Sequence, residues 1–269
     1  MSSRRILIPA LMLLVSIAVV SLPASAQCID LPGCELVWSD EFDGTAVDPS
    51  KWGFMLGDGT SVGLPPGWGN NELQYYRAEN ATVSGGQLVI SAREESFGGR
   101  DYTSARMRTI GLGDWTYGRF EMRATMPVGQ GLWPAFWMLS TFDAYGGWAA
   151  SGEIDIMEYL GHDTDHVSGA IHYGGSWPDN VFWSKGYTLA AGSFAESMHD
   201  FALEWGPHEI RWYVDGAQYS CQSHWSSGGG GYPAPFDQEF HLILNLAVGG
   251  YLPGPPDETT SFPQELVVD

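Results

Sequence analysis

Three carboxylic acids lie close together in the segment 152–158. The segment reads Gly-Glu-Ile-Asp-Ile-Met-Glu, so the acids are Glu153, Asp155 and Glu158. Side chains alternate along a strand, so Glu153 and Asp155 would share one face and Glu158 would point to the other. One extra residue, a β-bulge at 156–157, returns Glu158 to the face of the other two acids. We therefore predict a bulged strand that gathers three carboxyl groups, with Ile154 and one of the two bulge residues facing the core.

Such a group of acids suits the hydrolysis of a glycosidic bond. Neighbouring carboxylates repel one another, which raises the pKa of at least one of them. A retaining glycosidase needs one carboxylate to attack the anomeric carbon and one protonated acid to release the leaving oxygen. Glu153 and Glu158 would be this pair, and Asp155 would share a proton or a hydrogen bond with Glu153. The alternative is an exposed acidic strand whose bulge has no catalytic purpose.

The strand motif resembles the active-site signature of the family 16 glycoside hydrolases, in the bulged form of their laminarinase-like members. Further blocks resemble the family in the same order along the chain: Trp38-Ser-Asp-Glu-Phe42, Gly69-Asn-Asn-Glu-Leu-Gln-Tyr-Tyr76, Tyr102-Thr-Ser-Ala-Arg106, Tyr117-Gly-Arg-Phe-Glu121, Leu132-Trp-Pro-Ala-Phe-Trp-Met-Leu139 and Asn245-Leu-Ala-Val-Gly-Gly250. The resemblance implies a β-jelly roll whose concave sheet forms a substrate cleft. It makes Glu153 the nucleophile, Glu158 the general acid/base and Asp155 their auxiliary.

The activity implied by the resemblance is retaining endo-hydrolysis of β-1,3-glucan, as in laminarin. Two alternatives stay open. The same chemistry could act on mixed-linkage β-1,3/1,4-glucan or a galactan, or transfer the sugar to an acceptor other than water. A non-catalytic glucan-binding protein of the same fold is the second alternative, although such relatives typically lose the catalytic carboxylates that this chain keeps.

Several residues outside the acidic motif are candidates for binding sugar. Trp133, Trp137 and Trp148 could stack on the C–H faces of pyranose rings, or could equally be core residues. By resemblance, the side chains of Asn70, Asn71 and Arg106 hydrogen-bond sugar hydroxyls, and His172 approaches the catalytic acids from the neighbouring strand. The alternatives are a turn for the two asparagines, an ion pair for the arginine and a structural role for the histidine.

No cofactor is expected for catalysis, but the resemblance implies a structural calcium ion. Its ligands would be the backbone oxygens of Glu41 and Gly86 and the side chain of Asp269, hard oxygen ligands that suit calcium. Family members usually continue beyond this aspartate through one more edge strand, whereas the sequence ends at Asp269. Either the sequence is a fragment or the domain lacks its last edge strand, and the chain departs from the family pattern at the calcium site.

The elements that would carry these residues are strands. Polar and apolar residues alternate over 119–126, and the segments 88–92 and 240–248 are more continuously apolar, as buried strands can be. The run 209–214, followed by Asp215-Gly216 and 217–219, indicates a β-hairpin. Only short stretches such as 193–198 favour helix. Many strands at roughly ten-residue spacing predict an all-β, two-sheet sandwich.

Composition narrows the class of partner. The formal net charge is −20, with 12 Lys and Arg against 32 Asp and Glu. Nucleic acid and anionic membranes are therefore disfavoured, because phosphate groups require cationic side chains. Sulfated galactans are disfavoured for the same reason, and a neutral β-glucan fits well.

The beginning of the chain has the pattern of a secretory signal peptide. Arg4 and Arg5 precede an apolar run over 6–20 and the small residues 24–26. We expect cleavage after Ala26, one catalytic domain over 27–269, and a secreted protein, extracellular or periplasmic, without a membrane segment after cleavage. We also expect a monomer. In an exported chain Cys28 and Cys34 could form a disulfide, which would leave Cys221 as a buried, unreactive thiol.

Overall fold

The computed structural model describes residues 35–269, and the folded unit within them is Val37–Asp269. The signal peptide expected over 1–26 and the cysteines Cys28 and Cys34 lie outside the described residues. Cys221 is described and is an exposed free thiol, so the expectation that it is buried was wrong. Within the described part of the chain, no helix is both long enough and apolar enough to cross a membrane.

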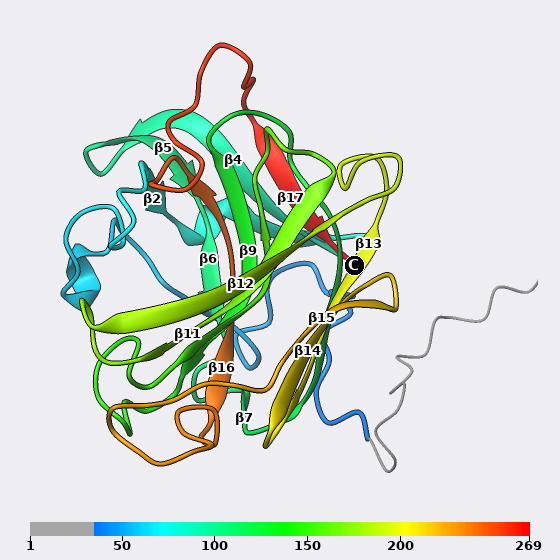
Figure 1. Cartoon of the computed structure of the whole chain (residues 1–269). Helices are drawn as coiled ribbons and strands as arrows, with labels where there is room; N and C mark the ends of the chain where they lie inside the picture. The colour runs from blue at the N-terminus through cyan, green and yellow to red at the C-terminus, as the bar shows by residue number, and fades with distance from the viewer. Residues whose placement is uncertain (1–34) are drawn as a thin grey trace, which may run out of the picture. The chain divides into compact units, whose positions relative to one another are not determined.

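The first of two β-sheets has eight strands and carries the acidic motif. Its path runs β1-β6-β16-β9-β10-β11-β12, with β7 pairing to β16, and all of its pairs are antiparallel (Figure 1). The strands are β1 (Gly53–Phe54), β6 (Arg106–Arg108), β7 (Asp114–Trp115), β9 (Leu132–Ser140), β10 (Glu153–Tyr159), β11 (His166–Gly174), β12 (Asn180–Thr188) and β16 (Phe240–Val248).

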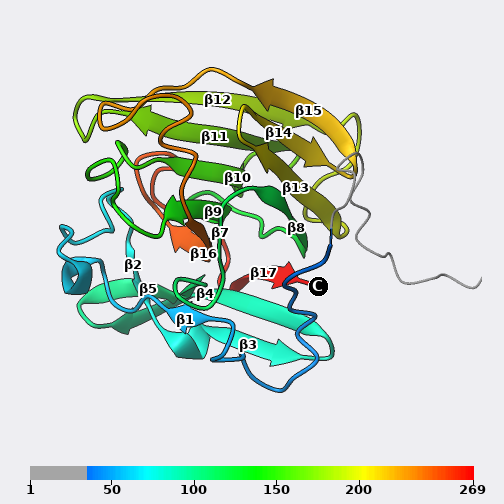
Figure 2. The ribbon, with the colours of Figure 1, turned by 90° about the horizontal axis from the view of Figure 1, so that it is seen from below.

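The second sheet has nine strands, and Figure 2 shows its strands β13, β14 and β15 beside β10, β11 and β12 of the first. Its path runs β15-β14-β13-β8-β17-β4-β5-β2, with β3 pairing to β4. The strands are β2 (Gln74–Tyr76), β3 (Ala81–Ser84), β4 (Gln87–Phe97), β5 (Arg100–Ser104), β8 (Gly118–Thr125), β13 (His199–Gly206), β14 (Glu209–Val214), β15 (Ala217–Gln222) and β17 (Gln264–Val268). The last strand, β17, is hydrogen-bonded on both sides, to β4 and β8.

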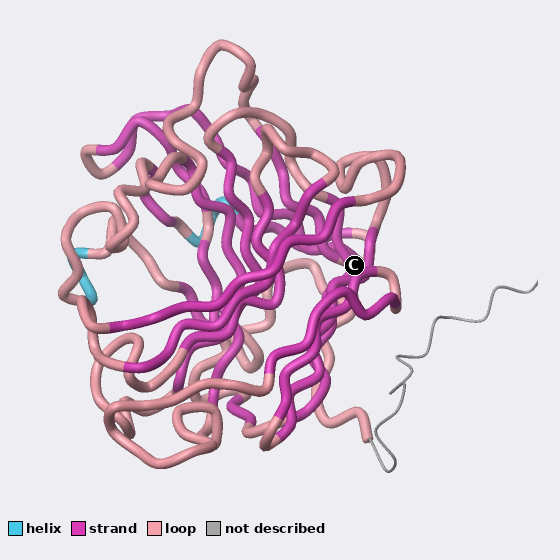
Figure 3. The backbone as a smooth tube through the Cα atoms, in the orientation of Figure 1, coloured by secondary structure: helices cyan, strands magenta, loops and turns pink. Residues whose placement is uncertain are grey.

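Helix is nearly absent from residues 35–269. Two short 3₁₀ segments, η1 (Thr60–Val62) and η2 (Ala78–Asn80), are the helical elements of this region (Figure 3). The segment 193–198, which favoured helix, is a turn instead. Phe194 within it is fully buried in the core, and its backbone N–H donates to Thr164 of a neighbouring loop. Tertiary contacts therefore decide the conformation of this segment.

The residue patterns that predicted strands are confirmed. The alternating segment 119–126 is β8, whose Phe120, Met122 and Ala124 are buried. The predicted hairpin is β14 and β15, joined at Asp215-Gly216 with positive φ at both positions. The prediction of an all-β, two-sheet sandwich is also confirmed.

One apolar core joins the two sheets. Its members come from both sheets and include Ile154 and Tyr159 of β10, Val167 of β11, and Trp205 and Trp212 of β13 and β14. The core therefore fixes one face of the eight-stranded sheet and leaves the other for chemistry. We call this second face the open face.

Candidate active site

The predicted bulge in β10 is present. The pairing of β10 with β9 shifts between Asp155 and Met157, and its pairing with β11 shifts between Asp155 and Glu158. Ile156 and Met157 are both buried in the core, so two consecutive side chains point inward. Only one of these two bulge residues was expected to face the core. Glu153, Asp155 and Glu158 consequently share the open face, as predicted.

His172 of β11 lies against the first two acids. It pairs in register with Glu153, and its Nε2 lies 3.3 Å from Asp155 Oδ2 and 3.9 Å from Glu153 Oε1. In register, Ser168 of the same strand stands opposite Glu158. His172 was expected to approach the catalytic acids from the neighbouring strand, and the register places it opposite Glu153 and next to Asp155. Glu153, Asp155 and His172 have ligand atoms within 4.8 Å of one another. Among residues 35–269 they are the only group of three or more His, Cys, Asp or Glu side chains that could hold a metal ion.

Each glutamate receives a hydrogen bond from a tryptophan. Trp148 Nε1 donates to Glu153 Oε2 at 2.6 Å, and Trp133 Nε1 donates to Glu158 Oε1 at 3.1 Å. The Trp148 side chain is 40% exposed, and Trp133 is half-buried on β9. Neither is a core residue, so both rings border the acids at the open face.

The environment gives the acids different proton affinities. Burial, and then the negative charge of Glu153, raises the pKa of Glu158 to about 7. Burial, and then Glu153, also holds the pKa of Asp155 well above its usual range. Burial lowers the pKa of His172, but the contact with Asp155 and the charges of the acids outweigh it and raise that pKa to about 9. Glu158 can therefore hold a proton near neutral pH, beside a histidine that is charged there.

A second group of polar and aromatic residues continues along the open face from β9 to β6. The guanidinium carbon of Arg106 lies 4.7 Å from the ring centroids of both Trp68 and Trp137, a cation–π arrangement. Trp137 Nε1 donates to Asn245 Oδ1 at 2.7 Å. Arg106 is 94% buried, and its Nε has no hydrogen-bond partner. Among residues 35–269 Arg106 forms no ion pair, so the alternative of an ion pair finds no support.

The two asparagines lie in the loop before β2 and have different surroundings. Asn70 Nδ2 donates to the buried Glu72 at 3.3 Å, and its backbone oxygen accepts from Tyr251 N–H. Gly250, next to Tyr251, packs against Trp133 and the Asn70 backbone, which places this loop beside the aromatic ring at Glu158. Asn71 is exposed and has a φ of 60°, a conformation typical of turn asparagines.

Some residues of the open face were not among the candidates from sequence. Asn245 and Glu72 both lie within sequence blocks that resemble the family, and this resemblance could have marked them as site residues. Phe182 of β12 lies outside these blocks, and no sequence pattern marked it as a site residue. It is 65% exposed, and its ring stacks on His172 at a centroid distance of 5.6 Å. Strand pairing alone brings it there, because Phe182 is opposite His172 in register.

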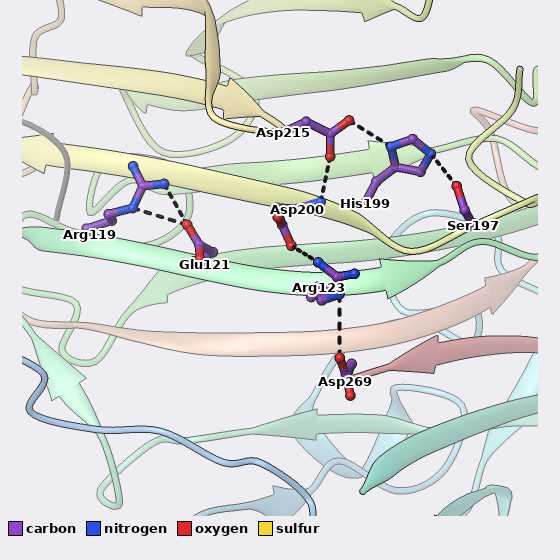
Figure 4. Close-up of polar contacts among 8 residues, drawn as sticks. All are labelled: Arg119, Glu121, Arg123, Ser197, His199, Asp200, Asp215 and Asp269. Atoms are coloured by element: carbon purple, nitrogen blue, oxygen red, sulfur yellow. Dashed lines mark hydrogen bonds and ion pairs between the residues drawn. The ribbon is translucent and has the colours of Figure 1, made fainter. Parts of the chain in front are cut away.

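Two of the three residues expected to bind calcium, Gly86 and Asp269, adjoin strands of the nine-stranded sheet and not the open face. The Asp269 carboxylate is exposed, and its Oδ2 lies 3.4 Å from Arg123 Nε, whose guanidinium also contacts Asp200 (Figure 4). A cation would have to compete with this arginine for the carboxylate. Gly86 lies in the β3–β4 turn with open space around its Cα. The calcium site therefore stays a prediction.

A two-sheet sandwich with paired glutamates on one open face, a raised pKa on one of them, and tryptophans beside both defines a glycosidase of the jelly-roll class. The model of glycosyl hydrolases family 16 matches residues 69–261. The chain belongs to this family and is a glycoside hydrolase that acts on O-glycosyl bonds.

Relatives and solved structures agree with this assignment. A β-glucanase of Rhodothermus marinus is 44% identical over 257 residues, covering 88% of this chain and 84% of that protein. The laminarinase catalytic domain of Thermotoga maritima is 46% identical with a TM-score of 0.77, covering 87% of this chain and 95% of that one. The endo-β-1,3-glucanase of Pyrococcus furiosus is 40% identical with a TM-score of 0.78, covering 86% and 90%. The resemblance to the laminarinase-like branch is thus confirmed.

Proposed function

We propose that this protein is a secreted endo-β-1,3-glucanase that cleaves laminarin-like glucan with retention of configuration. Glu153 attacks the anomeric carbon while Glu158 gives its proton to the glycosidic oxygen, which leaves with the aglycone. Glu158 then takes a proton from water, and the water oxygen displaces Glu153 from the sugar. The observation that carries the proposal is the shared face of these two acids in β10, with Glu158 near pKa 7.

Asp155 and His172 support the reacting acids in this proposal. Burial and the charge of Glu153 hold the pKa of Asp155 well above its usual range, which limits the negative charge that Asp155 adds beside Glu153. The imidazolium of His172 balances charge within the cluster. Together, these two groups limit the net negative charge around Glu153.

Sugar binding is proposed along the open face on both sides of the acids. Trp133, Trp137 and Trp148 supply ring faces for pyranoses, because each is only partly buried. Arg106 places its guanidinium against the rings of Trp68 and Trp137, and the Asn70 backbone lies with Trp133 beside Gly250. Asn71 is exposed at the same loop and could reach a hydroxyl.

The substrate proposal rests on the named relatives, which include a β-glucanase, a laminarinase and an endo-β-1,3-glucanase. Secretion rests on the pattern of residues 1–26, and recovery of a chain that starts at Gln27 from the culture medium would support it. We also propose that its partner is a neutral glucan and that the protein is a monomer.

The decisive experiment compares Glu153→Ala with wild type. Release of reducing ends from laminarin should fall at least about a thousandfold, because the nucleophile is lost. Azide should rescue cleavage of an activated aryl glycoside and yield a product of inverted configuration, since the small anion enters from the side that the carboxylate vacated. Glu196→Ala, an exposed glutamate in a turn, should behave as wild type. Near-normal activity of Glu153→Ala would refute the assignment.

A further inference from the structure

The bulge that brings Glu158 to the open face is contacted from the opposite sheet. Trp212 of β14 is fully buried, and its Nε1 donates a hydrogen bond of 2.8 Å to the backbone oxygen of Asp155. Asp155 is the last residue of β10 in regular register before the shift. The indole therefore supplies a donor at the point where the ladder is interrupted.

Gly169 of β11 leaves the space that this indole occupies. A Cβ built on Gly169 would collide with Cδ1 and Nε1 of Trp212, the atoms of the pyrrole ring that carries the donor. Its neighbours in the strand are Ser168 and Ala170, which pair with Glu158 and Asp155 respectively. Gly169 thus lies opposite the two bulge residues, 156 and 157, on the core side of the sheet.

A bulge is a weakly determined point in a sheet. Regular pairing fixes a strand through repeated hydrogen bonds, and the bulged residues lose part of that ladder. Small rotations at positions 156 and 157 would swing Glu158 relative to Glu153, which is held by regular pairing with Leu139 and His172. A contact from outside the ladder is needed to fix the bulge in one conformation.

We propose that Trp212 and Gly169 form a positioning device that holds the bulge and thereby aims the acid/base Glu158 at the scissile oxygen. Trp212 does not touch substrate in this proposal and acts only through the Asp155 carbonyl. The inference rests on the proposed roles of Glu153 and Glu158, and goes beyond them by assigning their relative placement to a residue of the other sheet.

The test is the variant Trp212→Phe, assayed on two substrates. Laminarin has a poor leaving group and needs a proton from Glu158, whereas a 2,4-dinitrophenyl β-glucoside leaves without one. kcat/KM reports only the steps up to the first irreversible one, which here is the departure of the leaving group. It therefore depends on proton donation by Glu158 for laminarin but not for the aryl glucoside. Trp212→Phe should lower kcat/KM about ten- to a hundredfold on laminarin, mainly through kcat, and leave the aryl glucoside nearly unaffected.

Two further variants separate positioning from general destabilisation. Trp225→Phe removes another buried indole that donates 2.8 Å to a backbone oxygen, that of Pro233, away from the bulge. It should lower the melting temperature comparably and leave the ratio of the two activities unchanged. Gly169→Ala should mimic Trp212→Phe, and the double variant should lose little more than either single one, because both break the same contact.

The outcomes distinguish this inference from the proposed function. Glu158→Ala must itself lose laminarin activity far more than aryl glucoside activity, and failure there would refute the role of Glu158. If Glu158→Ala shows the selective loss but Trp212→Phe affects both substrates equally, or neither, the positioning role is refuted alone. Additive losses in the Gly169→Ala/Trp212→Phe double variant would also contradict it.

Discussion

At the scale of single residues, two glutamates five positions apart, Glu153 and Glu158, have different environments. Glu153 has Trp148 as donor and His172 within 3.9 Å, while Glu158 has Trp133 as donor and its charge is disfavoured by burial. The difference is what a two-step displacement requires, because one acid must be ionised when the other is protonated. The roles follow from surroundings rather than from residue type.

The pKa of Glu158 predicts the alkaline side of the pH profile. The reacting form is protonated, so kcat/KM on laminarin should fall as pH rises through about 7, approaching a tenfold loss per pH unit. The positive charge of His172 lowers this pKa, so His172→Gln should move the alkaline limb to higher pH. Kinetics from pH 4 to 10 would show this, with His208→Gln as an exposed control. A limb unmoved by His172→Gln would contradict the electrostatic coupling.

At the scale of elements, β10 owes its role to its neighbours. It lies between β9 and β11, which contribute Trp133 and His172 respectively to the acids. The bulge restores alternation after residue 157, so that Tyr159 points to the core and Glu158 does not. A strand at the edge of the sheet has only one neighbouring strand, so it could not receive such contacts from both sides.

The turn of the β14–β15 hairpin should be sensitive to substitution for stability alone. Gly216 has a φ of 75°, which an L side chain adopts only with strain. Gly216→Ala should lower the free energy of unfolding by about 1 kcal/mol, with kcat on laminarin unchanged. Urea unfolding measures this, and Gly231→Ala, where no atom lies within 4 Å of an added Cβ and φ is not positive, is the matched control. Equal stabilities of the two variants would contradict the turn assignment.

At the scale of the whole folded unit, two sheets share one core and leave one face for substrate. The chain carries a net charge of −20, so electrostatics at long range repel polyanions and neither attract nor repel a neutral glucan. The core therefore holds the sheets together, the open face carries the acidic cluster, and the net charge disfavours anionic polymers.

Activity on a neutral glucan should therefore depend little on salt. We expect kcat/KM on laminarin to change less than about twofold between 0.05 and 0.5 M NaCl, because screening acts on charged partners. On a panel of laminarin, curdlan, lichenan, agarose and carrageenan, laminarin should be cleaved fastest and sulfated carrageenan not at all. Faster cleavage of carrageenan or agarose than of laminarin would overturn the substrate proposal, and lichenan in first place would favour the mixed-linkage alternative.

The sequence by itself determined the strand class and the acidic motif. The period-two alternation in β8 and the Asp215-Gly216 turn could be predicted because the conformation of a strand or a tight turn depends on residues that are neighbours along the chain. The spacing of Glu153, Asp155 and Glu158 required a bulge for the same local reason. The resemblance of ordered blocks then gave the family, which the comparisons confirm.

Only the tertiary structure decided which distant residues meet at those acids. The position of His172 opposite Glu153, the stacking of Phe182 on it, and the indole of Trp212 at the bulge depend on strand register and on packing between sheets. The turn at 193–198 in place of a helix was likewise set by burial of Phe194. Alternation along one strand carries no information about which strand lies beside it, so the sequence pattern could not supply these contacts.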